Sequence, residues 1–490
     1  MAQYYDTLLW EYIANPGVRW LSLDKISERV FEYGMISYDE ITDKKKLNFV
    51  DVDLDKAAIY SWEDVYMTAQ LYNKQKQLPD FLPLSPKGVP EGGGILNTME
   101  LPLIEVIAEI ELNWVKVNRD KLKEIGTKLE NEIRVLEKQV HDLAGEPFNI
   151  KSPKQVGEIL FEKLWLPKWK KTKTGYSVSA EVLDELSKQY DIASKITLYR
   201  HYSKLLSTYI EGILELLDEN DFVHTSYNQA VTTTGRLSST APNLQNIPTG
   251  SGVAGEIREA FISRFENGSI IALDYSQVEV RILALMSGDE NLLNIFKAWE
   301  DMHAKTAEFI GTTDRKIAKA VNFWVIYGIS PFGLSKNINI SMADAKKYID
   351  GFNASYSKVP VFFENIIAAA GEKWYVETIY WRKRYLPAIR DRNAIIRKAA
   401  EREAMNMPIQ WTSADIIKLA MIEVAEFIKT HKLQSKMVMQ VHDELVFDVF
   451  PWEEDIIKTE VKKIMENIFS DKTIPLKVDI WEGINWREAK

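Results

Sequence analysis

Two aspartates each stand at the end of an otherwise apolar run. Asp274 closes SIIALD (269–274), and Asp443 follows KMVMQVH (436–442). A carboxylate in such a place is costly to desolvate, so a cation is expected beside it. If the two runs are neighbouring strands, the pair forms a hard-oxygen site for Mg²⁺, which takes one or two protein carboxylates and completes its shell with water and phosphate. Taken alone, either aspartate is typical of an ordinary turn or cap.

A helical segment between the two acids carries cations and rings on one face. In RKIAKAVNFWVIYG (315–328), Arg315, Lys319, Phe323 and Tyr327 recur every four residues and therefore share a stripe. Two cations followed by two rings suit a triphosphate followed by a sugar and a base, because cations neutralise phosphate oxygens and rings stack. The alternative is an amphipathic helix, which would place solvated cations and core-facing rings on opposite faces.

The elements that position these residues predict an α+β protein. The run at 269–274 is predicted to be a strand that passes into a helix, and residues 436–449 are predicted to form a hairpin with the acids at its turn. Some 160 mostly helical residues lie between them, and residues 96–220 are also expected to be helical, with Ser152 and Pro153 starting one helix. A helix is expected from Ser61 to about Gln77, followed by a Pro- and Gly-rich linker in the segment 85–95.

Composition excludes several classes of protein. With 490 residues, 46% hydrophobic and 27% charged, the chain has the balance of a globular protein of several domains. It has no cysteine, which excludes disulfides and thiolate zinc sites. Its net charge of −10 argues against a generally basic protein but is compatible with a locally basic groove. The sequence contains no signal peptide and no long apolar segment, so no membrane association and a cytoplasmic location are expected.

Five segments, in order, resemble the bacterial DNA polymerase I family (family A). They are TTTGRLSSTAPNLQNIP (232–248), DYSQVEVR (274–281), the segment 315–328, MNMPIQ (405–410) and QVHDELVF (440–447). The resemblance implies a right-hand polymerase with an antiparallel palm sheet and helical thumb and fingers, preceded by a partial exonuclease-like domain. The implied divisions are an exonuclease-like remnant (1–84), linker (85–95), thumb and palm entry (96–225), palm (226–284), fingers (285–405) and palm (406–490).

The resemblance also assigns roles to individual residues. The implied catalytic acids are Asp274 and Asp443, which bind metal, and Glu444, an accessory acid; the implied nucleotide contacts are Arg315, Lys319, Phe323, Tyr327, His303 and Gln277; and the implied DNA contacts are Arg236, Asn406, Gln410 and His442. Glu279 matches the family's steric gate, in which an acid beside the ribose 2′ position rejects a hydroxyl by crowding.

The implied function is a DNA-directed DNA polymerase that uses two Mg²⁺ ions, primer–template DNA and dNTPs, and acts as a monomer in DNA replication and repair. Two alternatives stay open at this point. A single-subunit RNA polymerase would share the metal acids and a similar fingers helix, although Glu279 and the His442–Asp443–Glu444 triplet favour the DNA enzyme. The second alternative is a catalytically impaired protein that binds a primer–template without extending it.

The first 84 residues resemble only the rear half of a 3′–5′ exonuclease domain. Tyr60 and Asp64 match its last acidic motif, but the motifs that carry the other metal acids have no counterpart in the sequence. We therefore expect Asp64 to be a helix cap rather than a working metal ligand, and we expect no proofreading activity.

Eight tryptophans stand where the family typically has glycine: Trp114, Trp165, Trp299, Trp324, Trp374, Trp381, Trp411 and Trp481. Overpacking or a forced backbone costs about 1–3 kcal/mol at a site, so the chain as written is expected to be strained. We hypothesise that the gene comes from a lineage that reads UGA as glycine and that it was translated with UGA as tryptophan. UGG codons at these positions would contradict this hypothesis.

Overall fold

The computed structural model describes residues 5–18, 20–77, 94–168, 171–172, 175–250, 252–469 and 473–490. Most of the predicted linker at 85–95 lies outside the described residues, which resume at Gly94. In the described part of the chain, no helix has both the length and the apolar character needed to cross a membrane.

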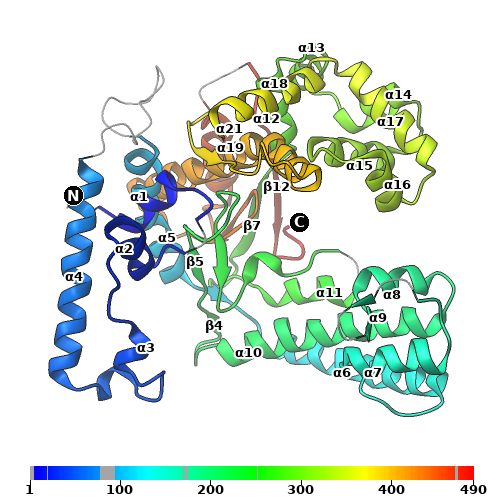
Figure 1. Cartoon of the computed structure of the whole chain (residues 1–490), viewed down its shortest axis with the longest axis horizontal. Helices are drawn as coiled ribbons and strands as arrows, with labels where there is room; N and C mark the ends of the chain where they lie inside the picture. The colour runs from blue at the N-terminus through cyan, green and yellow to red at the C-terminus, as the bar shows by residue number, and fades with distance from the viewer. Residues whose placement is uncertain are drawn as a thin grey trace.

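A four-stranded antiparallel sheet occupies the centre of the molecule (Figure 1). Its strand order is β10 (Lys436–Val441), β11 (Glu444–Val449), β7 (Ser269–Tyr275) and β12 (Val478–Gly483). Both predictions for this region are confirmed, since β7 leads into α12 (Val278–Ser287) and β10 and β11 form the hairpin. In the register, Asp274 lies opposite Glu444 on one side and opposite Asp479 on the other.

Strand β7 is covered on both faces, which explains its continuous apolar run. Ile271 and Leu273 belong to one hydrophobic cluster, whereas Ile270 and Ala272 belong to another, as the alternation of side chains in a strand requires. The remaining strands form two-stranded sheets: β1 (Val115–Lys116) with β4 (Phe222–Val223), β2 (Lys171–Thr172) with β3 (Gly175–Tyr176), β5 (Ser226–Asn228) with β6 (Ser238–Thr240), and β8 (Tyr375–Glu377) with β9 (Lys383–Tyr385).

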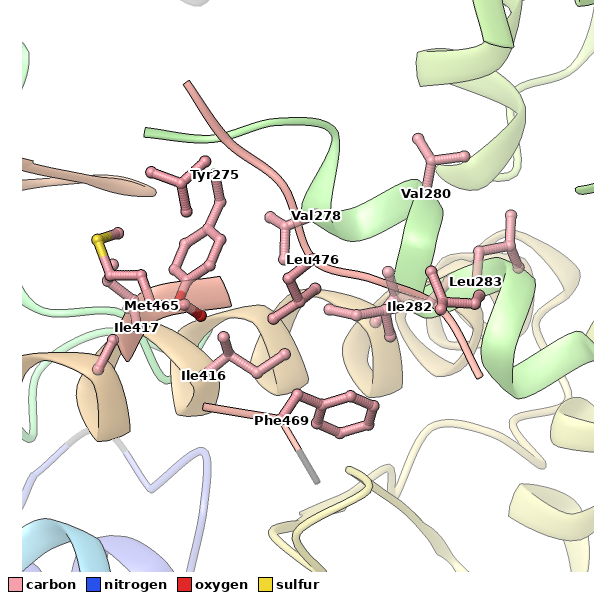
Figure 2. Packing of buried hydrophobic residues seen from close by; sticks show 14 of the residues in the cluster. Tyr275, Val278, Val280, Ile282, Leu283, Ile416, Ile417, Met465, Phe469 and Leu476 are labelled. Atoms are coloured by element: carbon pink, nitrogen blue, oxygen red, sulfur yellow. The ribbon is translucent and has the colours of Figure 1, made fainter. Parts of the chain in front are cut away.

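The end of β7 is anchored on the long helix α19 (Ala394–Thr430). Tyr275 and Val278 pack in one cluster with Ile416 and Ile417 of α19 (Figure 2). The buried Tyr275 hydroxyl donates to the carbonyl of Met465, 2.8 Å away. Because apolar packing and a satisfied hydroxyl both hold this turn, the backbone that presents Asp274 is fixed.

Three groups of helices surround the sheet (Figure 1). Before β7 come α5 (Leu101–Asn113), α6 (Arg119–Ala144), α7 (Pro153–Gly157), α8 (Ala180–Ser187), α9 (Asp191–Lys204), α10 (Gly212–Leu216) and α11 (Val253–Glu256). Between β7 and α19 come α13 (Glu290–Lys297), α14 (Met302–Ile310), α15 (Arg315–Ile326), α16 (Pro331–Ile338), α17 (Met342–Ser355) and α18 (Lys358–Lys373), and α20 (Glu454–Ile456) and α21 (Lys462–Asn467) follow β11. The expected helix start is confirmed, since Ser152 caps α7 and Pro153 is its first residue.

The amino-terminal part contains α1 (Thr7–Ala14), α2 (Leu23–Phe31), α3 (Tyr38–Ile41) and α4 (Leu54–Lys76). The predicted helix start at Ser61 is wrong, because α4 begins at Leu54 and Asp53 accepts a hydrogen bond from the Lys56 amide. Asp64 therefore lies inside the helix and does not cap it. Burial, together with the neighbouring Glu63, raises the pKa of Asp64, while a hydrogen bond from Tyr60 opposes this rise.

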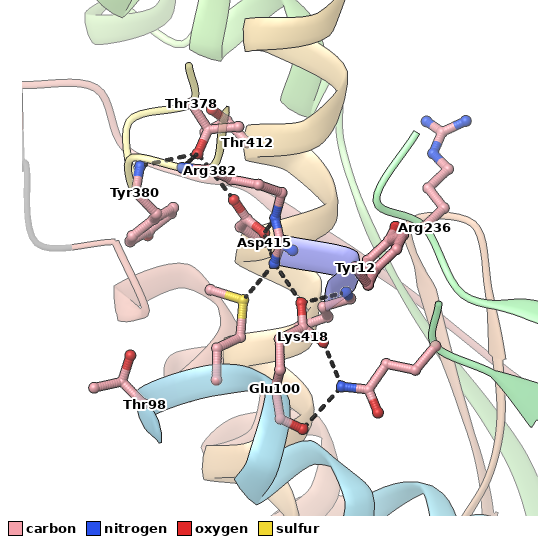
Figure 3. A network of polar contacts seen from close by, with 12 residues as sticks. Tyr12, Thr98, Glu100, Arg236, Thr378, Tyr380, Arg382, Thr412, Asp415 and Lys418 are labelled. Carbon is pink, nitrogen blue, oxygen red and sulfur yellow. Dashed lines mark hydrogen bonds and ion pairs between the residues drawn. The ribbon is translucent and has the colours of Figure 1, made fainter. Parts of the chain in front are cut away.

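A buried charge network joins α19 to the segment that precedes α5 and to the turn between β8 and β9 (Figure 3). Glu100 is fully buried, accepts a hydrogen bond from Lys418 at 2.8 Å and is paired with Arg382. Arg382 also pairs with Asp415 at 2.7 Å. Burial acts to raise the pKa of Glu100, but Lys418 and Arg382 outweigh it and lower that pKa to about 2. Since a buried charge without its partner is strongly destabilising, the network fixes α19 against the segments that carry Glu100 and Arg382.

The backbone divides the tryptophans at family-glycine positions into two groups. Five have positive φ: Trp114 (53°), Trp165 (55°), Trp299 (56°), Trp374 (67°) and Trp381 (65°). Trp114, with ψ 171°, is close to a region that only glycine normally occupies. A further tryptophan outside the predicted set, Trp452, has φ 78° and is 93% exposed. Positive φ costs a residue with a side chain about 1–2 kcal/mol, so the expected strain resides at these six positions.

The other three positions have ordinary backbone conformations, since Trp324 and Trp411 lie within α15 and α19 and Trp481 lies within β12. Trp411 is buried, and its indole N–H donates to the carbonyl of Thr233 at 3.0 Å. The strain expected at the family-glycine positions is therefore not seen in the backbone at these three tryptophans.

Candidate active site

The two predicted metal acids meet at one end of the sheet. Asp274 is the penultimate residue of β7, and Asp443 lies in the two-residue turn between β10 and β11. The amide of Tyr275 donates to the carbonyl of Asp443 at 3.1 Å, which joins the two backbone segments directly. The hydroxyl of Ser413 on α19 donates to Asp443 Oδ1 at 3.3 Å. Sheet register and α19 together thus bring the two carboxylates side by side.

Carboxylates crowd around Asp274. Its pKa is raised to about 7, chiefly by burial and then by the charge of Glu444, with smaller contributions from Asp443 and Asp479; Lys490 opposes the rise. A cluster with this excess of negative charge attracts a divalent cation. Hard carboxylate oxygens on adjoining strands suit Mg²⁺, which uses one or two protein carboxylates. Among the described residues, no three His, Cys, Asp or Glu side chains form a ready-made metal cluster.

Glu444 lies opposite Asp274 in the register, but both of its carboxylate oxygens are hydrogen-bonded to other residues. It is 1% exposed, its Oε1 accepts from the indole N–H of Trp486 at 3.0 Å, and its Oε2 accepts from Lys490 Nζ at 2.5 Å. Both oxygens of the predicted accessory acid are therefore engaged within the protein. The residues available to hold a metal ion are Asp274 and Asp443.

Glu279, the predicted steric gate, is held from two sides. Arg236 Nη2 donates to Glu279 Oε1 at 2.9 Å and lies 3.9 Å from Asp443 Oδ1, and the hydroxyl of Tyr327 donates to Glu279 Oε2 at 3.0 Å. Burial raises the pKa of Glu279 and Asp443 adds to the rise, whereas Arg236 and Tyr327 oppose it. This chain of contacts connects the metal acids to the end of α15.

The predicted nucleotide face lies on α15. Arg315 and Phe323 are 57% and 49% exposed, Lys319 is exposed, and Tyr327 follows the last residue of the helix. The rings of Phe323 and Tyr327 have centroids 4.7 Å apart. The core-facing side of the helix carries other residues, including Ala318 and Val321. Arg315, Lys319 and Phe323 thus face outward as the spacing predicts, whereas Tyr327 is half-buried against the hydrophobic core.

Two polar contacts order the start of this face. Asp301 accepts two hydrogen bonds from Arg315, at 2.9 and 2.7 Å. The amide of Asn322 donates to Nδ1 of the buried His303 at 2.8 Å. Burial lowers the pKa of His303, and Arg315 lowers it further, so the ring is neutral near pH 7. His303 therefore lies behind the exposed cations.

Of the predicted DNA contacts, Arg236 and His442 adjoin Asp443, and His442 is exposed with φ 55°. Asn406 and Gln410 lie on α19, and the buried Oδ1 of Asn406 has no hydrogen-bond donor among the described residues. Gln410 contacts the hydroxyl of Tyr327. Burial raises the pKa of that hydroxyl to about 12, and the bond to Gln410 opposes the rise. Gln277, a predicted nucleotide contact, has φ 54° and precedes α12.

Sequence reasoning missed four residues that touch this cluster: Ser413, Asp479, Trp486 and Lys490. Asp479 had a usable signal, since it is the second residue of the alternating run VDIW (478–481). The other three had none, because their contacts with Asp443 and Glu444 join residues 30 to 46 positions apart in the chain.

The sheet with two acids at its end, covered by α19 and flanked by an outward-facing cationic helix, defines a polymerase palm and fingers. The family model for DNA polymerase family A matches residues 119–488, and the chain belongs to this family.

Individual relatives are similar along nearly the whole chain. DNA polymerase I of Bacillus subtilis (strain 168) is 42% identical over 99% of this chain and 55% of its own length, and that of Pseudomonas aeruginosa is 38% identical over 99% and 54%. The chain therefore spans about half the length of these relatives. A solved structure, the POL domain of Pol1 from M. smegmatis in complex with DNA primer-template and dNTP, matches with a TM-score of 0.86 and 30% identity, covering 99% of this chain and 82% of that one.

Proposed function

We propose that this chain is a template-directed DNA polymerase that adds dNMPs to a primer 3′-hydroxyl in DNA replication and repair. The observation that carries the proposal is the pairing of Asp274 and Asp443, connected through Arg236 and Glu279 to Tyr327 at the end of α15. A metal-binding acid pair beside a helix with exposed cations and rings suits a nucleoside triphosphate. The solved relative bound to primer–template DNA and dNTP supports the same substrates.

The proposed cofactors are two Mg²⁺ ions held by Asp274 and Asp443. When bound, two such ions would lower the pKa of the attacking primer hydroxyl and would stabilise the charge on the leaving pyrophosphate. Arg315 and Lys319 neutralise the triphosphate, and Arg315 exchanges its carboxylate partner, Asp301, for phosphate oxygens as it does so. Phe323 offers an exposed ring on which the incoming base stacks.

Glu279 is proposed to exclude ribonucleotides. An acid held by both Arg236 and Tyr327 cannot swing aside at low cost, because both hydrogen bonds would have to break. A fixed carboxylate crowds a 2′-hydroxyl, whereas a mobile one would yield to it. This observation favours the DNA polymerase over a single-subunit RNA polymerase.

The proposed assembly is a monomer on primer–template DNA, and the proposed compartment is the cytoplasm, where DNA and dNTPs are present in bacteria. Light scattering of the purified chain, alone and with a primer–template, measures the oligomeric state.

The chain retains all the predicted metal and nucleotide residues. This retention argues against the alternative of a catalytically impaired primer–template binding protein.

The test is primer extension with dNTPs, with NTPs, and with dNTPs in the presence of a chelator. We expect extension only with dNTPs and metal. Asp443→Ala should abolish extension while leaving primer–template affinity within about twofold, because it removes a metal ligand and not a phosphate-binding cation. Asp455→Ala, which alters an aspartate whose side chain is 98% exposed, is the matched control and should extend like the parent. Extension by Asp443→Ala at the parental rate would refute the proposal.

A further inference from the structure

The last residues of the sequence hold a carboxylate of the active-site cluster. Trp486 and Lys490 each donate one hydrogen bond to Glu444, at 3.0 and 2.5 Å, and together they occupy both of its oxygens. Glu444 is 1% exposed, so water does not compete for these oxygens. A buried carboxylate with an indole donor and an ammonium partner has a defined orientation.

The segment that supplies these donors is itself fixed. Trp486 is fully buried, packs edge-on against Phe261 with centroids 5.5 Å apart, and lies 3.7 Å beneath the guanidinium of Arg258. The amide of Trp486 donates to the carbonyl of Phe261 at 2.9 Å, and the amide of Ala489 donates to Asn485 at 3.1 Å. The donors are therefore presented by packed structure and not by a free chain end.

Lys490 also lies close to the metal acids. Its partner Glu444 is directly opposite Asp274 in the register and is adjacent to Asp443 in the chain. Because directly paired residues of antiparallel strands place their side chains on the same face of the sheet, the Lys490–Glu444 ion pair shares a face with Asp274. The Lys490 side chain is 34% exposed, so its ammonium stands between the buried Glu444 and solvent at the edge of the cluster.

We propose that Lys490 is a positioning residue for the polymerase reaction: together with Trp486 it holds Glu444 away from the metal ions, and its positive charge limits how tightly Asp274 and Asp443 bind them. The proposal rests on the proposed function, in which those two aspartates are the metal ligands. Without Lys490, Glu444 loses its ionic partner and becomes available as a third ligand. Metal binding then tightens while the geometry needed for turnover is lost.

The first test measures Mn²⁺ binding by electron paramagnetic resonance in the absence of DNA and dNTP, and so needs no catalysis. A unit charge about 8 Å from a divalent ion in water changes the binding constant by about fivefold, and a freed Glu444 adds to this. Lys490→Met should therefore bind Mn²⁺ about five- to twentyfold more tightly than the parent. Lys490→Arg retains the cation and should stay within about twofold of the parent.

The matched control is Lys458→Met. Lys458 pairs with Glu482 on β12 at 2.9 Å, and Glu482 lies opposite Ile271, three residues from Asp274 along β7. This control removes a more exposed Lys–Glu ion pair, whose acid lies on the same sheet, and should leave the Mn²⁺ affinity unchanged. An unchanged affinity in Lys490→Met, or an equal shift in Lys458→Met, would overturn the proposal.

The second test is kinetic. Lys490→Met should lower kcat for dNTP addition about tenfold with KM for dNTP within about twofold, since the change affects the acids and not the nucleotide face. In a Glu444→Gln background, which lacks the ionised carboxylate, the same substitution should have no further effect on kcat. Additive losses would show that Lys490 does not act through Glu444 and would overturn its positioning role.

Trp486→Phe keeps a buried ring and removes the N–H donor, so it should shift Mn²⁺ affinity and kcat in the same directions by a smaller factor. Opposite shifts would contradict the proposal. A parent chain that binds Mn²⁺ but fails to extend primers would refute the proposed function while leaving the Mn²⁺ comparison valid.

Discussion

Replacing tryptophan by glycine should have opposite effects on stability at the two kinds of position. At Trp374, which follows α18 with φ 67° and ψ 8°, glycine removes a left-handed cost of about 1–2 kcal/mol and restores the residue that helix ends prefer. Glycine also has more conformational freedom in the unfolded chain, and this lowers the free energy of unfolding by about 0.5–1 kcal/mol. The net gain is about 0.5–1 kcal/mol at Trp452, where the exposed ring contributes no packing, and is smaller at Trp374, whose ring centroid lies 4.8 Å from the guanidinium of Arg390.

Trp411 is the matched control. Its ring is buried and its N–H is bonded to Thr233, so Trp411→Gly leaves a cavity, costs about 3–5 kcal/mol for the lost side chain and adds about 1 kcal/mol for glycine within a helix. The assay is denaturant unfolding of single variants followed by circular dichroism. Equal destabilisation by glycine at Trp374, Trp452 and Trp411 would refute the reasoning from backbone conformation.

Three further outcomes follow from the site and the amino-terminal part. Glu279→Ala should raise the ratio of kcat/KM for NTP over dNTP about ten- to a hundredfold, because a clash worth about 1.4–2.8 kcal/mol is removed; an unchanged ratio means that Glu279 is no gate. Because burial lowers the pKa of His303 below its unfolded value, its contribution to stability is present above about pH 6.5 and is lost as the pH falls through the folded pKa. At acidic pH, the free energy of unfolding should fall less steeply with decreasing pH in His303→Gln than in the parent. An unchanged pH dependence would contradict the lowered pKa of His303. The chain should release no mononucleotides from a mismatched primer end, and metal-dependent release that is lost in Asp64→Ala would show a working exonuclease.

Local features of this protein could be predicted from the sequence because they depend on neighbours in the chain. The alternation and apolarity of 269–274 and 436–449 predict strands, and the four-residue spacing from Arg315 to Tyr327 predicts one helix face; all three are observed. The place of Asp274 and Asp443 at strand ends follows from the same patterns. One predicted helix boundary is wrong: α4 is capped by Asp53 and begins at Leu54, not at Ser61. Several polar residues in this region are suitable helix caps, so the sequence alone does not distinguish between them.

The arrangement of the side chains around the acids was decided only by tertiary structure. Strand order places Asp274 between Glu444 and Asp479, and no local pattern specifies which strands become neighbours. The contacts of Arg236 with Glu279 and of Lys490 with Glu444 join residues 43 and 46 positions apart. Ion pairs over such separations exist only because the packed sheet and α19 bring the backbone segments together. The sequence by itself therefore determined which acids and cations could do the chemistry, whereas the packing decided which carboxylates lie side by side at the end of the sheet and which one has both oxygens hydrogen-bonded.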